Sequence, residues 1–330
     1  MSRESSYYLG VDAGGTKTYA LIADASGRAL GWGAAGTANW EAVGLEGARA
    51  AIAAALEGAL SAAGLRVGDL CAAGYGLAGL DWPSDEERLR PVIASLGVPG
   101  PQTLVNDAFV GLRAGTDDGC GVVVIAGTGA VVAGRNHAGA TFRTFGLGFQ
   151  WGDHGGAPEL VDLATRAVAH AYIGRGPATK LTELLLEAEA ARDVPELVER
   201  ATRSERGLPR GRLAPLVFVA AEQGDAVAQG LIAGIGRDLG ASAAAVARRL
   251  ELCGVPFELV LAGGVFRAGS ALLRDTLLEQ VRTLAPHARL ATLVPAPVAG
   301  GVLLALDSAG LPASRAIRER MAESIAGKLA

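Results

Sequence analysis

The chain has 330 residues and a formal net charge of -4, so its length favours two domains and its charge argues against nucleic acid as a main partner. Hydrophobic residues make up 50% of the chain, but no run of about 18 uncharged apolar residues predicts a membrane span. The N-terminus carries no apolar signal core before the first predicted strand, and we therefore expect a cytoplasmic protein. The three cysteines, Cys71, Cys120 and Cys253, are scattered and predict neither a disulfide framework nor a zinc site.

The first motif, YLGVDAGGTKT at residues 8–18, resembles a phosphate-binding P-loop but lacks its second glycine. Residues 18–24 are rich in β-branched and apolar side chains, so they predict a strand where a P-loop would have a helix. The motif therefore predicts a β-hairpin whose tip, residues 12–16, lets the backbone approach an anionic ligand. The candidate ligand-binding residues at this tip are Asp12, Gly14, Gly15, Thr16 and Lys17. Asp12 could hold Mg2+ directly or through water, although an ordinary glycine turn explains the motif equally well.

A second glycine hairpin, at residues 121–134, begins a second set of elements in an order similar to the first. The first half predicts strands near 7–12, 18–24 and 28–34, a helix near 42–63, a strand near 69–77, a helix near 84–96, a strand at 102–106 and a helix from Ala108. The second half predicts strands near 121–126, 130–135 and 141–145, a long helical region, a strand at 257–262, a helix, a short strand near 289–293 and a further helix. This repetition implies an α/β fold of two duplicated domains, with a ligand at the strand ends that face the cleft between them.

The two hairpins resemble those of the actin, hsp70 and sugar-kinase superfamily, in which they grip the phosphates of ATP from opposite sides. The resemblance implies two ribonuclease-H-like (actin-like ATPase) domains, at residues 1–118 and 119–311, with a C-terminal helix in 312–330 joined to the first. Mg-ATP would lie in the cleft between them. Beyond the first hairpin, the implied nucleotide-binding residues are Gly127, Thr128, Gly263 and Gly264. Two helices, starting near Asp107 and near Gly300, would cross at the hinge.

Further motifs, in chain order, resemble the BadF/BadG/BcrA/BcrD family, which includes N-acetylglucosamine kinases. They are G-T-A-N-W at 36–40, G-L-A-G at 76–79, N-D-A at 106–108 and W-G-D-H-G-G at 151–156. The resemblance implies an ATP-dependent kinase that phosphorylates the 6-hydroxyl of N-acetylglucosamine or a related amino sugar, glucosamine included. The sugar-site residues that it implies are Asn39, Trp40, Gly79, Asp107, Gly129 and Asp153. A homodimer is compatible with the resemblance.

Asp107 is the candidate catalytic base, because phosphoryl transfer needs an acid that orients and deprotonates the acceptor hydroxyl. It stands between a predicted strand and a predicted helix, where the helix dipole stabilises an anion. Its local sequence alone favours a simple helix N-cap. The resemblance favours catalysis, because the acid of N-D-A is the base in similar kinases, and one residue could serve both roles.

The candidate sugar-site residues also have ordinary structural explanations. Asn39 offers a donor and an acceptor for hydroxyl recognition but also suits a turn. Trp40 could stack on a sugar or serve as a core aromatic, and Asp153 could bind the sugar or cap the helix predicted from Ala157. Gly129 could present its backbone N–H to the sugar. The basic residues near the third strand of the second half are expected in a solvated turn; they are Arg135, His137 and Arg143.

Two positions depart from the family pattern. His154 stands where similar proteins often have Glu, and Ala130 stands where similar kinases often have Ser. A histidine titrates near neutral pH and cannot copy a carboxylate, and alanine offers no side-chain donor. Either change could alter the preferred sugar or abolish turnover, which would leave a binding protein.

Two other functions remain open at this point. An activator ATPase of the same family would need paired cysteines for an iron–sulfur cluster, whereas the three cysteines here are expected to be small buried residues. A sugar-sensing repressor is suggested by DAGGTKT, which resembles the start of the ROK family. The chain lacks that family's cysteine-rich zinc motif, and it begins at the first strand without a preceding DNA-binding segment.

Overall fold

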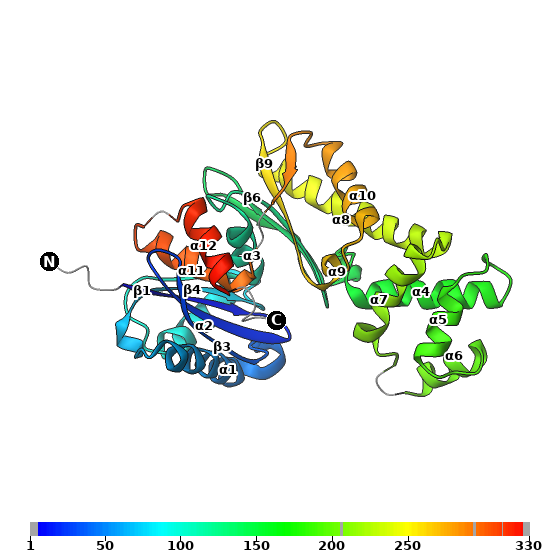
Figure 1. The fold of residues 1–330 in the computed structure, drawn as a ribbon, viewed down its shortest axis with the longest axis horizontal. Helices are drawn as coiled ribbons and strands as arrows, with labels where there is room; N and C mark the ends of the chain where they lie inside the picture. The colour runs from blue at the N-terminus through cyan, green and yellow to red at the C-terminus, as the bar shows by residue number, and fades with distance from the viewer. Residues whose placement is uncertain (1–5, 205–206, 293–294, 312, 326–330) are drawn as a thin grey trace.

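The computed structural model describes residues 6–204, 207–292, 295–311 and 313–325. These residues form two five-stranded sheets with the strand orders β3-β2-β1-β4-β5 and β10-β9-β6-β7-β8. In each sheet, an antiparallel hairpin is continued by parallel strands. The two sheets thus share one architecture, which confirms the predicted duplicated α/β fold (Figure 1).

The first sheet lies between helices on both faces, so its central strands are buried on both sides. Its strands are β1 (Tyr7–Ala13), β2 (Lys17–Asp24), β3 (Ala29–Gly36), β4 (Leu70–Leu77) and β5 (Gln102–Asn106). Helix α1 (Trp40–Ala63) packs closely on one face, because a Cβ at Gly33 would lie 2.1 Å from the Ala55 carbonyl oxygen. The connecting helices are α2 (Pro83–Ala94) and α3 (Asp107–Gly115), and a 3-10 turn precedes β4 at Val67–Asp69.

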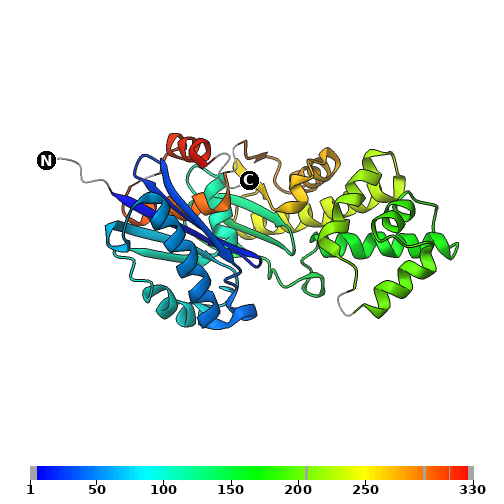
Figure 2. The same cartoon turned by 60° about the horizontal axis from the view of Figure 1, so that its bottom comes forward.

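The second sheet carries a large helical insertion between its third and fourth strands. Its strands are β6 (Gly121–Ala126), β7 (Ala130–Arg135), β8 (Thr141–Arg143), β9 (Phe257–Ala262) and β10 (Ala288–Leu290). After a 3-10 turn at Phe149–Trp151, the insertion contains α4 (Ala157–Tyr172), α5 (Leu181–Ala188), α6 (Val194–Arg203), α7 (Arg210–Glu222) and α8 (Ala226–Arg249). Two further helices follow β9, namely α9 (Gly264–Arg267) and α10 (Ala271–Arg282). The views in Figures 1 and 2 both place α4 to α7 at the end of the molecule away from the first sheet.

The last two described helices return to the first sheet. Helix α11 (Pro297–Ser308) falls within the range expected for the second domain, yet it packs on β1, where a Cβ at Gly10 would lie 2.5 Å from the Val298 carbonyl oxygen. Helix α12 (Arg315–Ile325) contacts β3 of the first sheet, because the N–H of Ala29, the first residue of β3, donates to Ser324 Oγ at 3.1 Å. The ends of the expected helix 312–330 lie outside the described residues.

Helix α3 connects the two sheets. Its residues Ala108 and Leu112 share a buried cluster with Val123 and Val260 of the second sheet. Its other side crosses α11 so closely that a Cβ at Gly300 would lie 1.8 Å from the Val110 carbonyl oxygen. The two helices that the sequence predicted at the hinge therefore cross in direct contact.

The sequence predicted that the three cysteines are small buried residues. All three cysteines are free, but Cys71 is exposed and Cys120 and Cys253 are half-buried, so the expectation that they are buried was wrong.

Within the described ranges, no single helix has the length and apolarity to cross a membrane. Helices α7 and α8 meet these criteria only as a pair, and that pair is bent by 115°.

Candidate functional site

Two cavities meet at Asp107. We call the first the hairpin cavity; it has a volume of about 590 Å³ and is lined by Asp12, Gly14, Asp107 and Gly263, among others. We call the second the loop cavity; it has a volume of about 560 Å³ and is lined by Asn39, Gly79, Asp107 and both glycine hairpins. Asp107 and Ile125 line both cavities. A group bound in one cavity would therefore face a group bound in the other across the Asp107 carboxylate.

The first hairpin contributes to both cavities. Gly14 closes the turn by donating its N–H to the Lys17 carbonyl at 3.0 Å, and its own carbonyl accepts from Thr37 Oγ1 at 3.1 Å. Asp12 and Gly14 line the hairpin cavity, whereas Gly15 and Thr16 line the loop cavity. Lys17 is exposed at the start of β2 and, among the described lining residues, belongs to neither cavity.

The second hairpin is fixed by the start of α4. The Gly127 N–H donates to the Gly129 carbonyl at 2.8 Å, and the Gly127 carbonyl accepts from Ala157 N at 2.7 Å. Gly127, Thr128 and Gly129 all line the loop cavity, facing the first hairpin. These bonds close the turn and tie it to the first residue of α4, so the backbone of the hairpin is held in a fixed position at the cavity wall.

The turn after β9 borders the hairpin cavity. Gly263 has a φ of 101°, and a Cβ there would lie 2.2 Å from the Ala126 carbonyl oxygen, so both its conformation and its space require glycine. Gly264 begins α9 and is absent from the described lining. The glycine pair thus places the chain close to β6 at the cavity wall.

Asn106, not Asp107, is the N-cap of α3. Its Oδ1 accepts from the Ala108 N–H at 3.1 Å, and Asp107 is the first helical residue. The cap of α3 is therefore supplied by the residue before Asp107. Burial, with a smaller contribution from Asp81, raises the pKa of Asp107 to about 6, while hydrogen bonding to the Ala108 backbone and the charge of Arg143 act in the opposite direction. This pKa leaves the carboxylate ionised at neutral pH and more basic than an ordinary aspartate.

Asp12 lines the hairpin cavity together with Asp107. Burial, and secondarily the charge of Asp107, raise the pKa of Asp12 to about 7. Among the described residues, Asp12 takes part in no ion pair. Asp107 is likewise absent from the ion pairs of the described residues. Two acids at one site, neither of them in an ion pair, suit a bound cation, and oxygen ligands are those that Mg2+ prefers.

The candidate sugar-site residues divide into lining and supporting residues. Asn39 caps α1 by accepting from the Glu41 N–H at 3.1 Å and also lines the loop cavity with Gly79. The Trp40 indole donates to the Gly79 carbonyl at 2.7 Å, and Arg88 lies 5.4 Å from its ring centroid. Trp40 is not among the described residues that line the loop cavity. The expected stacking residue thus holds the Gly79 turn in place.

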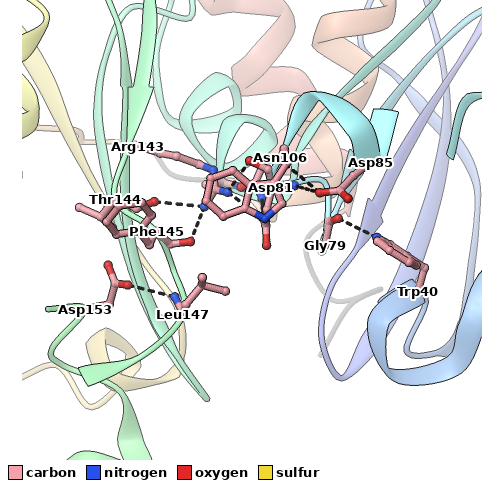
Figure 3. A network of polar contacts seen from close by, with 12 residues as sticks. Trp40, Gly79, Asp81, Asp85, Asn106, Arg143, Thr144, Phe145, Leu147 and Asp153 are labelled. Carbon is pink, nitrogen blue, oxygen red and sulfur yellow. Dashed lines mark hydrogen bonds and ion pairs between the residues drawn. The ribbon is translucent and has the colours of Figure 1, made fainter. Parts of the chain in front are cut away.

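Asp153 has a similar supporting position. It is only 7% exposed, and its Oδ2 accepts from the Leu147 N–H at 3.0 Å (Figure 3). Leu147 lines the loop cavity, whereas Asp153 is not part of the described lining. Asp153 therefore shapes the wall of the cavity through the segment 144–148, which we call the acceptor loop.

The structure adds an ion pair that the sequence did not predict. Arg143, expected in a solvated turn, is mostly buried and lies 2.9 Å from Asp81 Oδ1. Asp81 Oδ1 also accepts from Asn106 Nδ2 at 3.0 Å, next to Asp107. Asp81 follows the G-L-A-G motif by two positions, but the only signal was an acid near a motif. The pairing joins residues from the two halves of the chain, so local sequence could not reveal it.

The two departures from the family pattern have different surroundings. His154 Nδ1 lies 2.6 Å from Glu159 Oε1, and this contact raises the pKa of His154. Glu159 also accepts from the Gly155 N–H at 2.7 Å. Ala130 is 5% exposed and lines the loop cavity beside Gly129. A carboxylate is thus present beside position 154, supplied by the first turn of α4, whereas the methyl group of Ala130 offers the cavity no hydrogen-bond donor.

Comparisons with known proteins agree with this geometry. The chain is 29% identical over 324 residues to an N-acetyl-D-glucosamine kinase from Dictyostelium discoideum, with 93% of this chain and 99% of the relative covered. It is 29% identical over 262 residues to an N-acetylmuramic acid/N-acetylglucosamine kinase from Clostridium acetobutylicum, covering 78% of this chain and 85% of the relative. A solved structure of a candidate N-acetylglucosamine kinase from Chromobacterium violaceum superimposes with a TM-score of 0.67 at 26% identity, covering 91% and 99% of the two chains.

The family is shown by a match over most of the sequence. The model of the BadF/BadG/BcrA/BcrD ATPase family matches residues 9–305. This range contains both hairpins, both cavities and the crossing of α3 with α11. The chain therefore belongs to the BadF/BadG/BcrA/BcrD ATPase family and has its two-domain, actin-like ATPase fold.

Proposed function

We propose that this protein is an ATP-dependent amino-sugar kinase that transfers the γ-phosphate of Mg-ATP to the 6-hydroxyl of N-acetylglucosamine or a related amino sugar. The observation that carries the proposal is the meeting of two cavities at Asp107. A kinase needs a nucleotide site and an acceptor site that share one reacting point. The names of the two curated relatives, both kinases of N-acetylated sugars, support the acceptor class.

The hairpin cavity is the proposed nucleotide site. Its glycine turns at Gly14 and Gly263 let the backbone approach a ligand closely, and the remaining N–H groups of the first hairpin, those not bonded within the turn, would donate to phosphate oxygens. Gly127 and Thr128 would hold the terminal phosphate from the opposite side, where the hairpin borders the loop cavity. Asp12 would hold Mg2+, which neutralises phosphate charge when it is bound.

The loop cavity is the proposed sugar site. Asn39 and the backbone around Gly79 and Gly129 offer donors and acceptors for hydroxyl and acetamido groups. Asp107 would orient the acceptor hydroxyl and take its proton as the oxygen attacks the phosphorus atom. A base with a pKa of about 6 is ionised at neutral pH and still accepts a proton more readily than a solvent-exposed aspartate.

The test is a steady-state assay of ADP release from Mg-ATP with a panel of amino sugars and plain hexoses. We expect turnover with at least one N-acetylated amino sugar and a loss of about 100-fold or more in kcat for Asp107→Asn, the range for removal of a general base. Asp275→Asn is the matched control, because Asp275 is an exposed acid on α10 whose side chain is 65% exposed.

The panel also separates the competing functions. Hydrolysis of ATP that no sugar stimulates would favour an activator ATPase and contradict the kinase proposal. Turnover with glucosamine but not with N-acetylglucosamine would keep the kinase and change the acceptor. A panel without any turnover, in a protein that still binds sugar, would identify a binding protein and overturn the proposal.

A further inference from the structure

We propose that Asp81 and Arg143 form a latch between the two halves of the molecule that positions the acceptor loop, residues 144–148, against Asp107. The inference rests on the proposed kinase function and adds to it a pair of positioning residues. Both residues line the loop cavity themselves, and neither is proposed to bind ATP. Their proposed task is to give the acceptor site its working shape.

The Arg143 guanidinium is bonded on two sides. Its Nη2 lies 2.9 Å from Asp81 Oδ1 and donates to the Asp81 carbonyl at 3.0 Å. Its Nη1 donates to the carbonyls of Thr144 at 3.1 Å and Phe145 at 2.6 Å. One planar group thus joins the segment after β4 to the acceptor loop after β8 (Figure 3). Lysine could not reproduce this arrangement, because an ammonium group lacks the planar fork of donors.

The Asp81 side of the latch is held firmly. Asp85 is 5% exposed, and its Oδ2 accepts from the N–H groups of Asp81 at 3.0 Å and Trp82 at 2.8 Å. Asn106 Nδ2 donates to Asp81 Oδ1 at 3.0 Å, while Asn106 Oδ1 caps the helix that starts with Asp107. The position of Asp81 is therefore tied to that of the proposed base.

The Arg143 side continues into the cavity wall. Phe145 and Leu147 line the loop cavity, and the Leu147 N–H is bonded to the buried Asp153. The Phe145 ring lies 6.3 Å from the ring of Trp82 and 6.2 Å from the ring of Trp151, measured between centroids. The contact of Phe145 with Trp82 thus joins the two halves beside the ion pair, and the contact with Trp151 lies within the second half.

The burial of the pair makes its two members interdependent. The side chains of Arg143 and Asp81 are 14% and 10% exposed. Removing one partner leaves the other charge without compensation in a poorly solvated place, which costs more than removing both. The other half of the molecule would then no longer hold the acceptor loop, and the sugar would lose its fixed orientation toward Asp107.

The first test measures steady-state kinetics of Arg143→Gln, Asp81→Asn and the double variant. We expect each single variant to lower kcat/KM for the sugar by about 10-fold or more, with the KM for ATP within about two-fold of wild type. The double variant should lose less than the product of the two single losses, because the two groups interact directly. Arg143→Lys, which keeps the charge without the fork, should lie between wild type and Arg143→Gln.

The matched control is Arg210→Gln. Arg210 also pairs with an aspartate at 2.9 Å, but that pair is roughly half exposed and lies within the helical insertion. We expect wild-type kinetics for this variant. Losses that simply multiply in the double variant, or a wild-type kcat/KM in Arg143→Gln, would overturn the latch.

The second test does not depend on activity. Hydrogen exchange of the substrate-free protein should show faster exchange at residues 144–153 in Arg143→Gln than in wild type and in Arg210→Gln. Unchanged exchange there would contradict the latch even if the protein is a kinase. Faster exchange in a protein that phosphorylates no sugar would support the latch and reject the proposed function, so the two failures are distinguishable.

Discussion

The fold places Asp12 and Asp107 where burial disfavours the ionised form of each carboxyl group. Both line the hairpin cavity, and burial is the main cause of the raised pKa of each. Ionisable groups with strongly shifted pKa values are concentrated at functional sites, because catalysis needs groups poised near neutral pH. The two acids therefore give this site two properties that can be measured separately, a pH dependence of activity and a pH dependence of stability.

The first prediction concerns the pH dependence of activity. Asp107 acts as a base only when ionised, so kcat/KM for the sugar should fall as the pH decreases through about 6, the pKa of Asp107 in the free protein. An ordinary aspartate would keep activity down to about pH 4. The measurement is kcat/KM for the sugar from pH 4.5 to 8.5, and a value that stays constant down to about pH 5 would contradict the assignment.

The second prediction concerns stability. The folded protein favours the neutral form of Asp12, whose pKa is raised from 3.8 to about 7. Its ionisation thus destabilises the fold increasingly as the pH rises from 3.8 toward 7. Asp12→Asn should therefore raise the free energy of unfolding at pH 8 without Mg2+, on the order of 1–3 kcal/mol, and the gain should vanish near pH 4. The measurement is chemical denaturation at both pH values, with Asp275→Asn as control. A variant that is equally or less stable at pH 8 would reject this electrostatic account.

At this scale the sequence predicted the residues that lie in continuous motifs. Asp12, Asn39, Gly79 and Asp107 each line at least one of the two cavities, but their catalytic and binding roles stay predictions. The contact between Asp81 and Arg143 spans 62 positions, so it depends on how the two halves meet. The sequence also did not predict that Trp40 supports the Gly79 turn instead of lining the cavity. A local sequence pattern does not show whether a side chain points into a cavity or packs behind its wall.

At the scale of elements, glycines set how closely helices approach their neighbours. Gly10 and Gly301 lie at the contact between β1 and α11, where a Cβ at Gly301 would be 2.8 Å from the Gly10 Cα. Gly300 has the same role between α11 and α3. These contacts place the start of α3, and with it Asp107, at the junction of the cavities. Close backbone packing, together with the Asn106 cap, thus fixes the position of the proposed base.

The third prediction tests this packing. Gly300→Ala would bring a Cβ against the Val110 carbonyl oxygen, so we expect a loss of about 1–3 kcal/mol in the free energy of unfolding from overpacking. Gly230→Ala is the control, because Gly230 is exposed within α8 and has open space around it. The control should be neutral or more stable by up to about 1 kcal/mol. Equal stability of the two variants in urea denaturation would contradict the packing argument.

The sequence predicted most elements because their patterns are local. The strands and helices begin and end within a few residues of the expected positions; for example, the helix expected from Ala157 is α4 (Ala157–Tyr172). The strand expected over 141–145 ends at Arg143, where the acceptor loop begins. A short edge strand carries too few residues for its end to be predicted from hydrophobic alternation.

At the scale of the whole molecule, the order of elements in the two halves predicted the duplicated architecture. It did not predict that α11 packs on the first sheet. Nearly every residue of α11 is buried, so its sequence indicates a core helix but not which sheet it covers. The domain boundaries at 1–118 and 119–311 stay a prediction, and α11 is the element that a revised boundary would move.

The central claim is that nucleotide and sugar bind in two cavities that meet at Asp107. A crystal structure of the protein with Mg2+, a non-hydrolysable ATP analogue and N-acetylglucosamine tests it most directly. We predict the analogue in the hairpin cavity, the sugar in the loop cavity, and the 6-hydroxyl within hydrogen-bond distance of the Asp107 carboxylate. A sugar that binds with no hydroxyl near Asp107, or an analogue bound outside the hairpin cavity, would contradict the account.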